Sequence, residues 1–178
     1  MTIATRSYSA SELPQSLAWQ ALSFLRCEWP FLFAGDDRLR ARPFGSDETV
    51  CAVRTDGDVL LSYAEVHPVT ATRADAALRV LGLSNVFTFP PYRGEGHASA
   101  IMHAVGELIN HSDAELAILF CESDLVAFYS ARGWQLAPGG AIEAPGTAPA
   151  TMVRPVRAPE AGLARWLAAA PVLLATRW

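Results

Sequence analysis

Residues 86–98 restrict the possible fold of this chain more than any other segment, and they read Val-Phe-Thr-Phe-Pro-Pro-Tyr-Arg-Gly-Glu-Gly-His-Ala. The pattern predicts an apolar strand, a tight turn and a helix that begins near Glu95. A turn of this kind leaves backbone N–H groups unpaired at the positive end of a helix, where proteins bind phosphate. Gly94 and Gly96 carry no Cβ, so an anion can approach their backbone closely. The segment therefore favours a phosphate site over the alternative, a solvated turn with an exposed Arg.

The N-terminal part of the chain predicts one strand, one helix and a long connection. Residues 3–8 form the strand, and Ser11 or Pro14 opens a helix that runs to about Arg26 with apolar residues on most of its surface. Residues 28–47 are rich in Trp, Phe, Gly and Pro, which indicates a loop with short helical turns.

The middle of the chain predicts an antiparallel meander. Residues 49–54 and 59–67 are two strands joined through the Asp-Gly turn of residues 55–58. A second turn at residues 70–75 leads into a long third strand at residues 77–89. This strand enters the glycine turn and the helix that follows.

The next two predicted elements are a helix over residues 94–110 and an apolar strand over residues 115–121. We expect this strand to be parallel to the strand of residues 77–89, so that the three elements form a βαβ unit. Ser123 is a suitable N-cap for a helix to Arg132, and Gly133 suits the position after its end. The remaining predictions are a loop over residues 137–150, a closing strand over residues 151–156 and an Ala-rich helical tail over residues 159–178 that Pro171 interrupts.

Two motifs in this frame resemble those of the GCN5-related N-acetyltransferases, the GNAT superfamily. The first is Arg93-x-x-Gly96-x-Ala98 after a strand, which is similar to the loop that binds the pyrophosphate of acyl-CoA. The second is Ala-Phe-Tyr-Ser-Ala-Arg-Gly-Trp over residues 127–134, which is similar to the helix that ends in Tyr-x-x-x-Gly-aromatic. The second run is also similar to that of aminoglycoside 2′-N-acetyltransferases, which is a narrower hypothesis.

The resemblance implies a GNAT-type mixed α/β fold: a strongly twisted central sheet flanked by helices, with two splayed parallel strands and, here, the additional C-terminal helical tail. We expect one domain over residues 1–178, with the family core at residues 49–156. Acetyl-CoA is the implied co-substrate, held between the strands of residues 77–89 and 115–121. The implied cofactor-binding residues are Val86, Phe87, Thr88, Arg93, Gly94, Glu95, Gly96, His97, Ala98, Ser99 and Ser123.

The resemblance also implies the catalytic groups. Tyr129 matches the tyrosine that protonates the departing CoA thiolate, and the Val86 N–H lies where it would stabilise the oxyanion. Many family members carry a Glu in the strand before the loop, but Ser84 occupies that position here and serves at most to orient a water. Glu65, His67 and Glu122 are the other candidates for the general base, and for each a structural role is the alternative.

Composition excludes several other classes of function. A net charge of −4 gives no electrostatic reason to bind nucleic acid, and the 51% hydrophobic content with 18% charged residues indicates a globular chain. Three scattered cysteines suggest free thiols in a reducing cytoplasm, and we expect neither a signal peptide nor a membrane span. His97, His103 and His111 lack the spacing of a metal site, so we expect no metal.

We therefore expect a cytoplasmic N-acetyltransferase, monomeric or homodimeric, that transfers an acetyl group to a primary amine of a small molecule or peptide by direct attack. The alternative is a catalytically silent acyl-CoA-binding or interaction module of the same fold, which the missing strand carboxylate and the extra tail would also suit.

Overall fold

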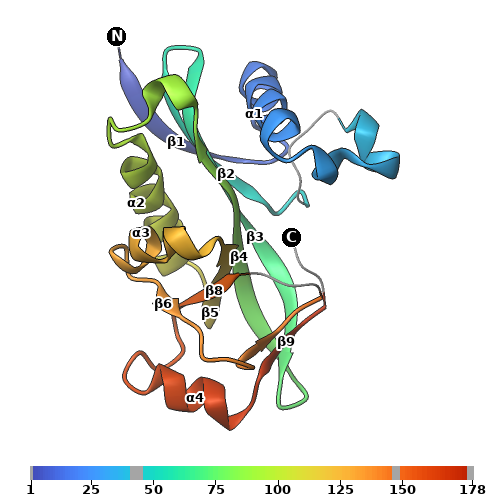
Figure 1. Ribbon diagram of the computed structural model, residues 1–178, viewed down its shortest axis with the longest axis vertical. Helices are drawn as coiled ribbons and strands as arrows, with labels where there is room; N and C mark the ends of the chain where they lie inside the picture. Colours follow the sequence, from blue (N-terminus) through green and yellow to red (C-terminus); the bar gives the residue numbers. More distant parts are fainter. Residues whose placement is uncertain (1, 41–45, 146–148, 176–178) are drawn as a thin grey trace. The chain divides into compact units, whose positions relative to one another are not determined.

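The computed structural model describes residues 2–40, 46–145 and 149–175, and it divides the chain into two compact units. Unit 1 comprises Met1–His67 and Asn85–Val105, and unit 2 comprises Pro68–Ser84 and Gly106–Trp178. Figure 1 shows the elements along the chain. Strands β3 (Val59–Arg73) and β4 (Ala76–Thr88) and helix α2 (His97–Asn110) each contribute residues to both units, so neither unit is a continuous piece of sequence.

The fold is mixed α/β, with a mostly antiparallel sheet flanked by helices, as expected. Its strands follow the order β1-β2-β3-β4-β5-β8-β6, while β9 pairs with β3 and β7 pairs with β9. The bounds of the strands outside β3 and β4 are β1 Ile3–Ser9, β2 Val50–Asp56, β5 Leu116–Cys121, β6 Gln135–Leu136, β7 Ile142–Glu143, β8 Ala150–Pro155 and β9 Val172–Leu174.

In unit 1, the side-chain amide of Gln20 attaches helix α1 (Gln15–Glu28) to the β2–β3 hairpin through both its nitrogen and its oxygen. Gln20 Nε2 donates to the Asp58 carbonyl (2.9 Å), and the Leu60 N–H donates to Gln20 Oε1 (2.8 Å). The buried face of α1 contributes to an apolar core with the inward side chains of β2 and β3. After α1 the chain forms two short 3-10 helices, η1 (Pro30–Phe33) and η2 (Gly35–Leu39), which agrees with the predicted turns; residues 41–45 of the predicted loop lie outside the described residues.

Aromatic rings form one side of this core. The rings of Phe24 and Phe87 stack with their centroids 4.1 Å apart, and the ring of Tyr63 stacks on Phe87 at 5.4 Å. Phe89 meets both Phe24 and Phe87 edge to face. Because rings in these geometries attract one another beyond the area that they bury, they fix the end of β4 against α1.

In unit 2, β5 pairs in parallel with β4 over Val80–Leu83 and antiparallel with β8. The parallel pairing confirms the predicted βαβ unit. The last registered pair is Leu83 with Leu119, and two residues later Asn85 has a positive φ of 52°. A non-glycine residue in this conformation inside a strand marks an irregularity such as a bulge, which ends regular pairing.

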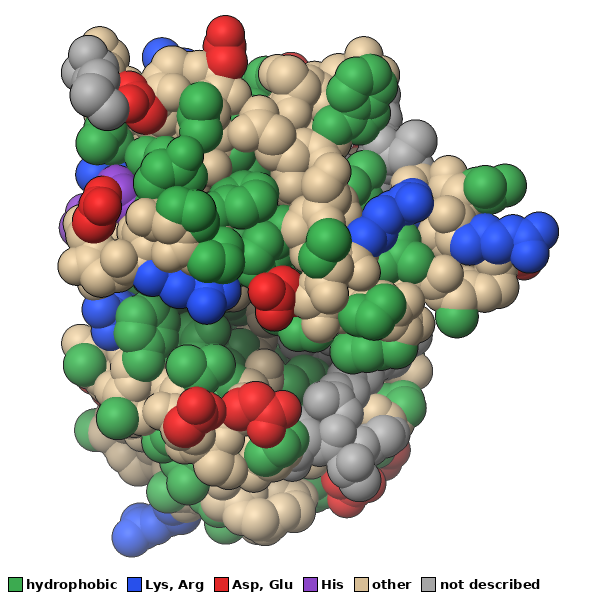
Figure 2. Space-filling view, turned by 45° about the horizontal axis from the view of Figure 1, so that its top comes forward, with side chains coloured by type: hydrophobic (Ala, Val, Ile, Leu, Met, Phe, Trp, Pro, Cys, Tyr) green, Lys and Arg blue, Asp and Glu red, His purple; other side chains and the backbone are tan. Residues whose placement is uncertain are grey.

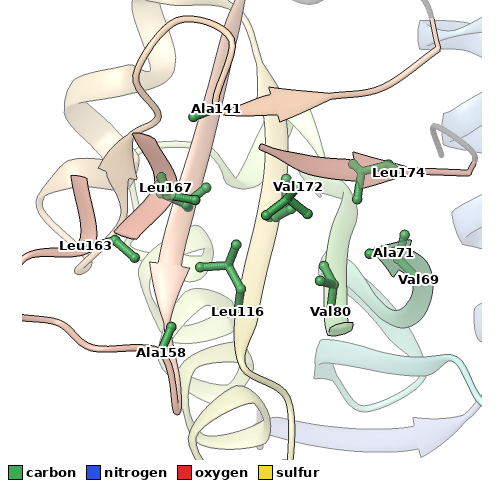
Figure 3. Close-up of a cluster of buried hydrophobic side chains, with 12 residues drawn as sticks. Val69, Ala71, Val80, Leu116, Ala141, Ala158, Leu163, Leu167, Val172 and Leu174 are labelled. Atoms are coloured by element: carbon green, nitrogen blue, oxygen red, sulfur yellow. The ribbon is translucent and has the colours of Figure 1, made fainter. Parts of the chain in front are cut away.

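The C-terminal segment completes the core of unit 2, although it was predicted as a helical tail outside the family core. It is helical only over α4 (Leu163–Ala169), and β9 follows as a strand paired with Ala71–Arg73 of β3. Figure 3 shows Leu163, Leu167 and Val172 packed with core side chains of β3, β4 and β5. The helix stops because Pro171 lacks the N–H that a helix needs, and the next residues find a sheet edge to pair with.

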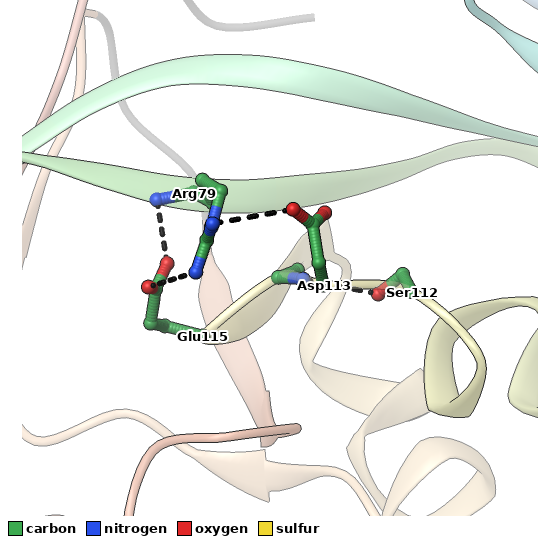
Figure 4. A network of polar contacts seen from close by, with 5 residues as sticks. Arg79, Ser112, Asp113 and Glu115 are labelled. Atoms are coloured by element: carbon green, nitrogen blue, oxygen red, sulfur yellow. Dashed lines mark hydrogen bonds and ion pairs between the residues drawn. The ribbon is translucent and has the colours of Figure 1, made fainter.

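A polar network at the surface of unit 2 joins the beginnings of β4 and β5, as Figure 4 shows. Arg79 donates to Glu115 Oε1 (2.9 Å) and lies 3.2 Å from Asp113, while its backbone N–H donates to Glu115 Oε2 (2.7 Å). Desolvation alone would raise the pKa of Glu115, but the hydrogen bonds and charge of Arg79 outweigh it and lower that pKa.

Two predicted boundaries are wrong. The turn expected at residues 70–75 contains only Ala74 and Asp75, with φ of 49° and 60°, because β9 provides a partner that extends β3 to Arg73. Helix α2 begins at His97 rather than near Glu95, since Gly94 and Gly96 have φ of 84° and 81°, which a right-handed helix cannot contain.

On the face that Figure 2 shows, acidic and Arg side chains are scattered among apolar ones. Among the described residues, no helix has both the length and the apolar character needed to cross a membrane.

Candidate functional site

The turn between β4 and α2 has the geometry of an anion cradle. It consists of a 3-10 helix, η3 (Pro90–Tyr92), then Arg93, and then Gly94 and Gly96, both with positive φ. A Cβ built on either glycine meets no heavy atom within 4 Å, so the space beside both residues is open. The backbone conformation therefore favours glycine at both positions, and the absence of a side chain leaves room for a ligand to approach the backbone closely.

Five consecutive backbone N–H groups in this turn, those of Gly94, Glu95, Gly96, His97 and Ala98, find no acceptor within the described part of the chain. The first bond of the helix runs from the Ala100 N–H to the Gly96 carbonyl (3.1 Å). These groups lie at the positive end of a helix of 14 residues. The turn thus presents the set of donors that a diphosphate accepts.

Side chains hold the turn from both sides. Ser62 Oγ donates to the Phe87 carbonyl (2.6 Å) and lies 2.9 Å from Thr88 Oγ1. Arg93 Nε donates to the Thr88 carbonyl (3.0 Å), so the side chain expected to contact phosphate also fixes the end of β4. Its guanidinium is exposed, and its Nη atoms point to no acceptor among the described residues.

Four hydrogen-bonded side chains close the base of the turn. No local pattern predicts this chain, because Arg54 lies 43 residues before His97 and 49 residues after Thr5. Arg54 Nε donates to His97 Nδ1 (3.0 Å), Arg54 Nη1 donates to Thr5 Oγ1 (2.8 Å), and His97 Nε2 lies 3.2 Å from Glu95 Oε2. A guanidinium only donates, so His97 Nδ1 accepts and the ring proton is on Nε2, directed at Glu95. The His97 ring is buried, with 4% of its surface exposed.

A second polar cluster lies inside unit 1 around Glu65, whose side chain is fully buried. Tyr63 Oη donates to Glu65 Oε1 (2.8 Å) and is 3.2 Å from Cys51 Sγ, while Glu65 Oε2 has no partner among the described residues. Burial raises the pKa of Glu65 to about 7, against the hydrogen bonds from Tyr63 and Asn85 and the charge of Arg40, which lower it. The cluster therefore contains a carboxyl group that titrates near neutral pH.

The other candidates for the general base have less suitable surroundings. Burial lowers the pKa of His67 to about 4, so its imidazole is a weak proton acceptor at neutral pH. Ser84 is half-buried in β4, and Glu122 is exposed at the end of β5. Between Glu65 and His67, Glu65 is the residue whose pKa suits proton transfer near pH 7.

In unit 2, the structure explains the spacing of the Tyr-x-x-x-Gly-aromatic motif. Helix α3 (Val126–Ser130) ends in bonds from the Trp134 N–H to the Tyr129 carbonyl (3.3 Å) and from the Gly133 N–H to the Ser130 carbonyl (3.2 Å), and Gly133 has a φ of 83°. This is a Schellman C-cap, which requires glycine at that position. The cap fixes Tyr129 on the last turn of the helix.

Tyr129 is buried, and its ring lies edge to face with the rings of Phe128 and Trp134. Burial, with the nearby Cys121 thiol, raises its pKa, so the phenol stays protonated at neutral pH. A protonated phenol can donate a proton.

Ser123 does not cap a helix. The segment begins as a 3-10 helix, η4 (Ser123–Leu125), whose cap position is Glu122, so the Ser123 side chain is one residue too late to bond the first free N–H groups. Within residues 2–40, 46–145 and 149–175, no three His, Cys, Asp or Glu side chains are grouped closely enough to bind a metal ion.

Comparison with known proteins relates this geometry to acyl transfer. Residues 4–137 match the family model described as acetyltransferase (GNAT) domain. The sequence matches no curated protein.

Among solved structures, the fold is similar to the GNAT family N-acetyltransferase YhbS from Escherichia coli in complex with CoA, at 19% identity over 97% of this chain and 88% of that one, with a TM-score of 0.65. It is also similar to ElaA from Escherichia coli, at 19% identity over 86% and 99% of the two chains with a TM-score of 0.61. An acyl-CoA N-acyltransferase from Pseudomonas aeruginosa is similar at 13% identity over 86% and 99%, with a TM-score of 0.62.

Proposed function

The chain belongs to the GNAT acetyltransferase family, and on this premise we propose that it transfers the acetyl group of acetyl-CoA to a primary amine of a small molecule or peptide. The observation that carries the proposal is the row of five N–H groups without acceptors at the start of α2. A helix N-terminus alone is a weak sign of a ligand. Here the family match and the two glycines in open space support the same reading.

The donor side of the proposal uses residues of the turn and of β4. The N–H groups of Gly94 to Ala98 bind the CoA pyrophosphate, and the Arg93 guanidinium adds positive charge. Ser99 and Ser123 offer hydroxyl groups to the cofactor. The backbone of Val86, Phe87 and Thr88 hydrogen-bonds the pantetheine arm, and the Val86 N–H stabilises the oxyanion of the tetrahedral intermediate.

For the acceptor amine, we assign proton removal to Glu65. The ammonium gives one proton to the Glu65 carboxylate, the nitrogen lone pair attacks the thioester carbon, and collapse of the tetrahedral intermediate breaks the C–S bond. Tyr129 protonates the CoA thiolate and is reprotonated by the second proton that leaves the nitrogen, while Glu65 returns its proton to solvent. Ser84 orients a water. The pKa of Glu65 near 7 supports this assignment, because a base is most effective close to the working pH.

The first test is acetyl transfer itself, measured as thiol release from acetyl-CoA with a panel of primary amines that includes aminoglycosides. We expect turnover, and we expect Tyr129→Phe and Glu65→Gln each to lower kcat by about 10²-fold or more, the contribution typical of a positioned acid or base. Calorimetry with CoA separates the alternatives. Binding without turnover on any amine identifies a silent acyl-CoA-binding module, and no binding contradicts the proposed function.

The second test concerns the turn. Gly96→Ala places a Cβ on a residue with a φ of 81°, which costs about 1–2 kcal/mol and distorts the N–H row. We expect the Kd for CoA to rise at least tenfold. Gly139→Ala is the matched control, because Gly139 has an ordinary φ and its Cβ would also meet nothing within 4 Å. Equal Kd values for both variants would show that the turn does not bind the cofactor.

A further inference from the structure

Glu95 is an anomaly in a turn that binds a diphosphate. Its carboxylate is negative, its side chain is 61% exposed, and it stands between the two glycines of the cradle. A free carboxylate beside unpaired N–H groups at a helix start accepts hydrogen bonds from them, as acidic residues at helix N-termini commonly do. Glu95 would in that way compete with the phosphate of the ligand.

The structure shows the carboxylate attached elsewhere. Glu95 Oε2 lies 3.2 Å from His97 Nε2, and the N–H groups of Gly94 to Ala98 remain without an acceptor among the described residues. His97 can donate to Glu95 only with its proton on Nε2. Arg54 enforces that tautomer by donating to Nδ1 at 3.0 Å, and Thr5 holds Arg54 in turn at 2.8 Å.

We propose that Arg54 and His97 are positioning residues that keep the Glu95 carboxylate away from the phosphate cradle. This inference rests on the proposed function of the turn. Arg54 fixes the tautomer of a buried imidazole, the imidazole binds the carboxylate, and the N–H row stays available to the cofactor. The same arrangement orders the first turn of α2 before any ligand arrives, which lowers the entropy cost of binding.

The test uses calorimetry with CoA and steady-state kinetics on His97→Leu, Glu95→Gln and the double variant, with Arg54→Met as a second way to release His97. We expect His97→Leu and Arg54→Met to raise the Kd for CoA and the KM for acetyl-CoA about tenfold, with kcat at saturation changed less than twofold. Tenfold corresponds to the loss of about one charge-assisted hydrogen bond.

The Glu95→Gln substitution tests whether His97 acts on CoA binding by holding the Glu95 carboxylate away from the N–H groups. Added to His97→Leu, it should return the Kd to within about twofold of the value for Glu95→Gln alone, because a neutral amide no longer competes as an anion. A merely structural role for His97 predicts no such rescue, and that result would overturn the proposal. His103→Leu, on an exposed position of the same helix, is the matched control and should leave the Kd unchanged.

The outcomes are separable. If the wild-type protein binds no CoA, the proposed function fails and this inference falls with it. If the wild-type protein binds CoA and His97→Leu binds it equally well, only this inference is overturned. Thermal unfolding of each variant, together with the Nδ1 and Nε2 nitrogen shifts of His97 by NMR, shows that the variants fold and that wild-type His97 carries its proton on Nε2.

Discussion

Burial has a larger effect on the pKa of Glu65 than its hydrogen bonds and the charge of Arg40 together. A carboxylate removed from water loses its hydration, and the hydrogen bonds from Tyr63 and Asn85 replace only part of it, so the proton is retained up to about pH 7. Such a residue makes the fold less stable at neutral pH than an uncharged residue of the same shape would. Groups that reduce stability in this way are concentrated at functional sites.

This leads to a prediction about stability and pH. The pKa of Glu65 rises from an ordinary value of 4.5 to about 7 in the folded protein. Below pH 4.5 both states hold the proton; between pH 4.5 and 7 the unfolded chain loses it first, so stability falls as the pH rises. The loss is on the order of 3 kcal/mol above pH 7. Glu65→Gln should therefore raise the thermal midpoint at pH 8 and leave it unchanged near pH 4.

Thermal unfolding across this range checks the prediction, with the exposed Glu107→Gln as control. A Glu65→Gln variant no more stable than wild type at pH 8 would mean that Glu65 is not buried as a carboxylate.

At the scale of secondary structure, the irregular backbone of β4 at Asn85 affects the pKa of Glu65. Asn85 has a φ of 52° and donates a side-chain hydrogen bond that lowers the pKa of Glu65. Asn85→Gly accepts this backbone conformation and removes only the hydrogen bond. The pKa of Glu65 should then rise further, and the pH at which kcat/KM increases should move upward with it. A pH profile identical to that of wild type would exclude Glu65 as the proton acceptor.

The C-terminal helix is a second element whose role can be measured. Leu167 of α4 has 1% of its surface exposed in the core of unit 2, whereas Leu173 of β9 is 42% exposed. Leu167→Ala leaves a cavity and should lower the free energy of unfolding by about 2–5 kcal/mol. Leu173→Ala removes the same atoms from the surface and should cost much less. Chemical denaturation of both variants gives the comparison, and equal losses would mean that α4 is not part of the core.

At the scale of the whole molecule, cofactor binding should stabilise the folded chain by mass action. Acetyl-CoA at 100 times its Kd adds about 2.7 kcal/mol, which appears as a higher thermal midpoint. Hydrogen exchange locates the effect: the amides of Gly94 to Ala98, which have no acceptor without ligand, should exchange more slowly with CoA bound. Desulfo-CoA should protect the same amides, whereas protection elsewhere alone would place the cofactor at another site.

Much of the fold could be predicted from local pattern. The Asp-Gly hairpin, the strand before the glycine turn and the helix after it each depend on neighbours within about ten residues, and the structure contains all three. The exceptions have distant causes. β3 extends to Arg73 because β9 pairs with it, and the C-terminal tail is partly a strand because the edge of β3 accepts it. Strand pairing is a long-range interaction that composition and periodicity do not encode.

The sequence by itself determined the glycine turn and the helix that follows it, because the conformation of Gly94 and Gly96 is a local property of the chain. It also determined the relation of Tyr129 to Gly133, since a helix cap has a fixed spacing. Only the tertiary structure decided that the pKa of Glu65 is raised, because this shift comes from the burial of its side chain in the folded protein. It likewise brought Arg54 to His97 across 43 residues. Desolvation and distant hydrogen bonds arise from packing, and packing exists only in the folded chain.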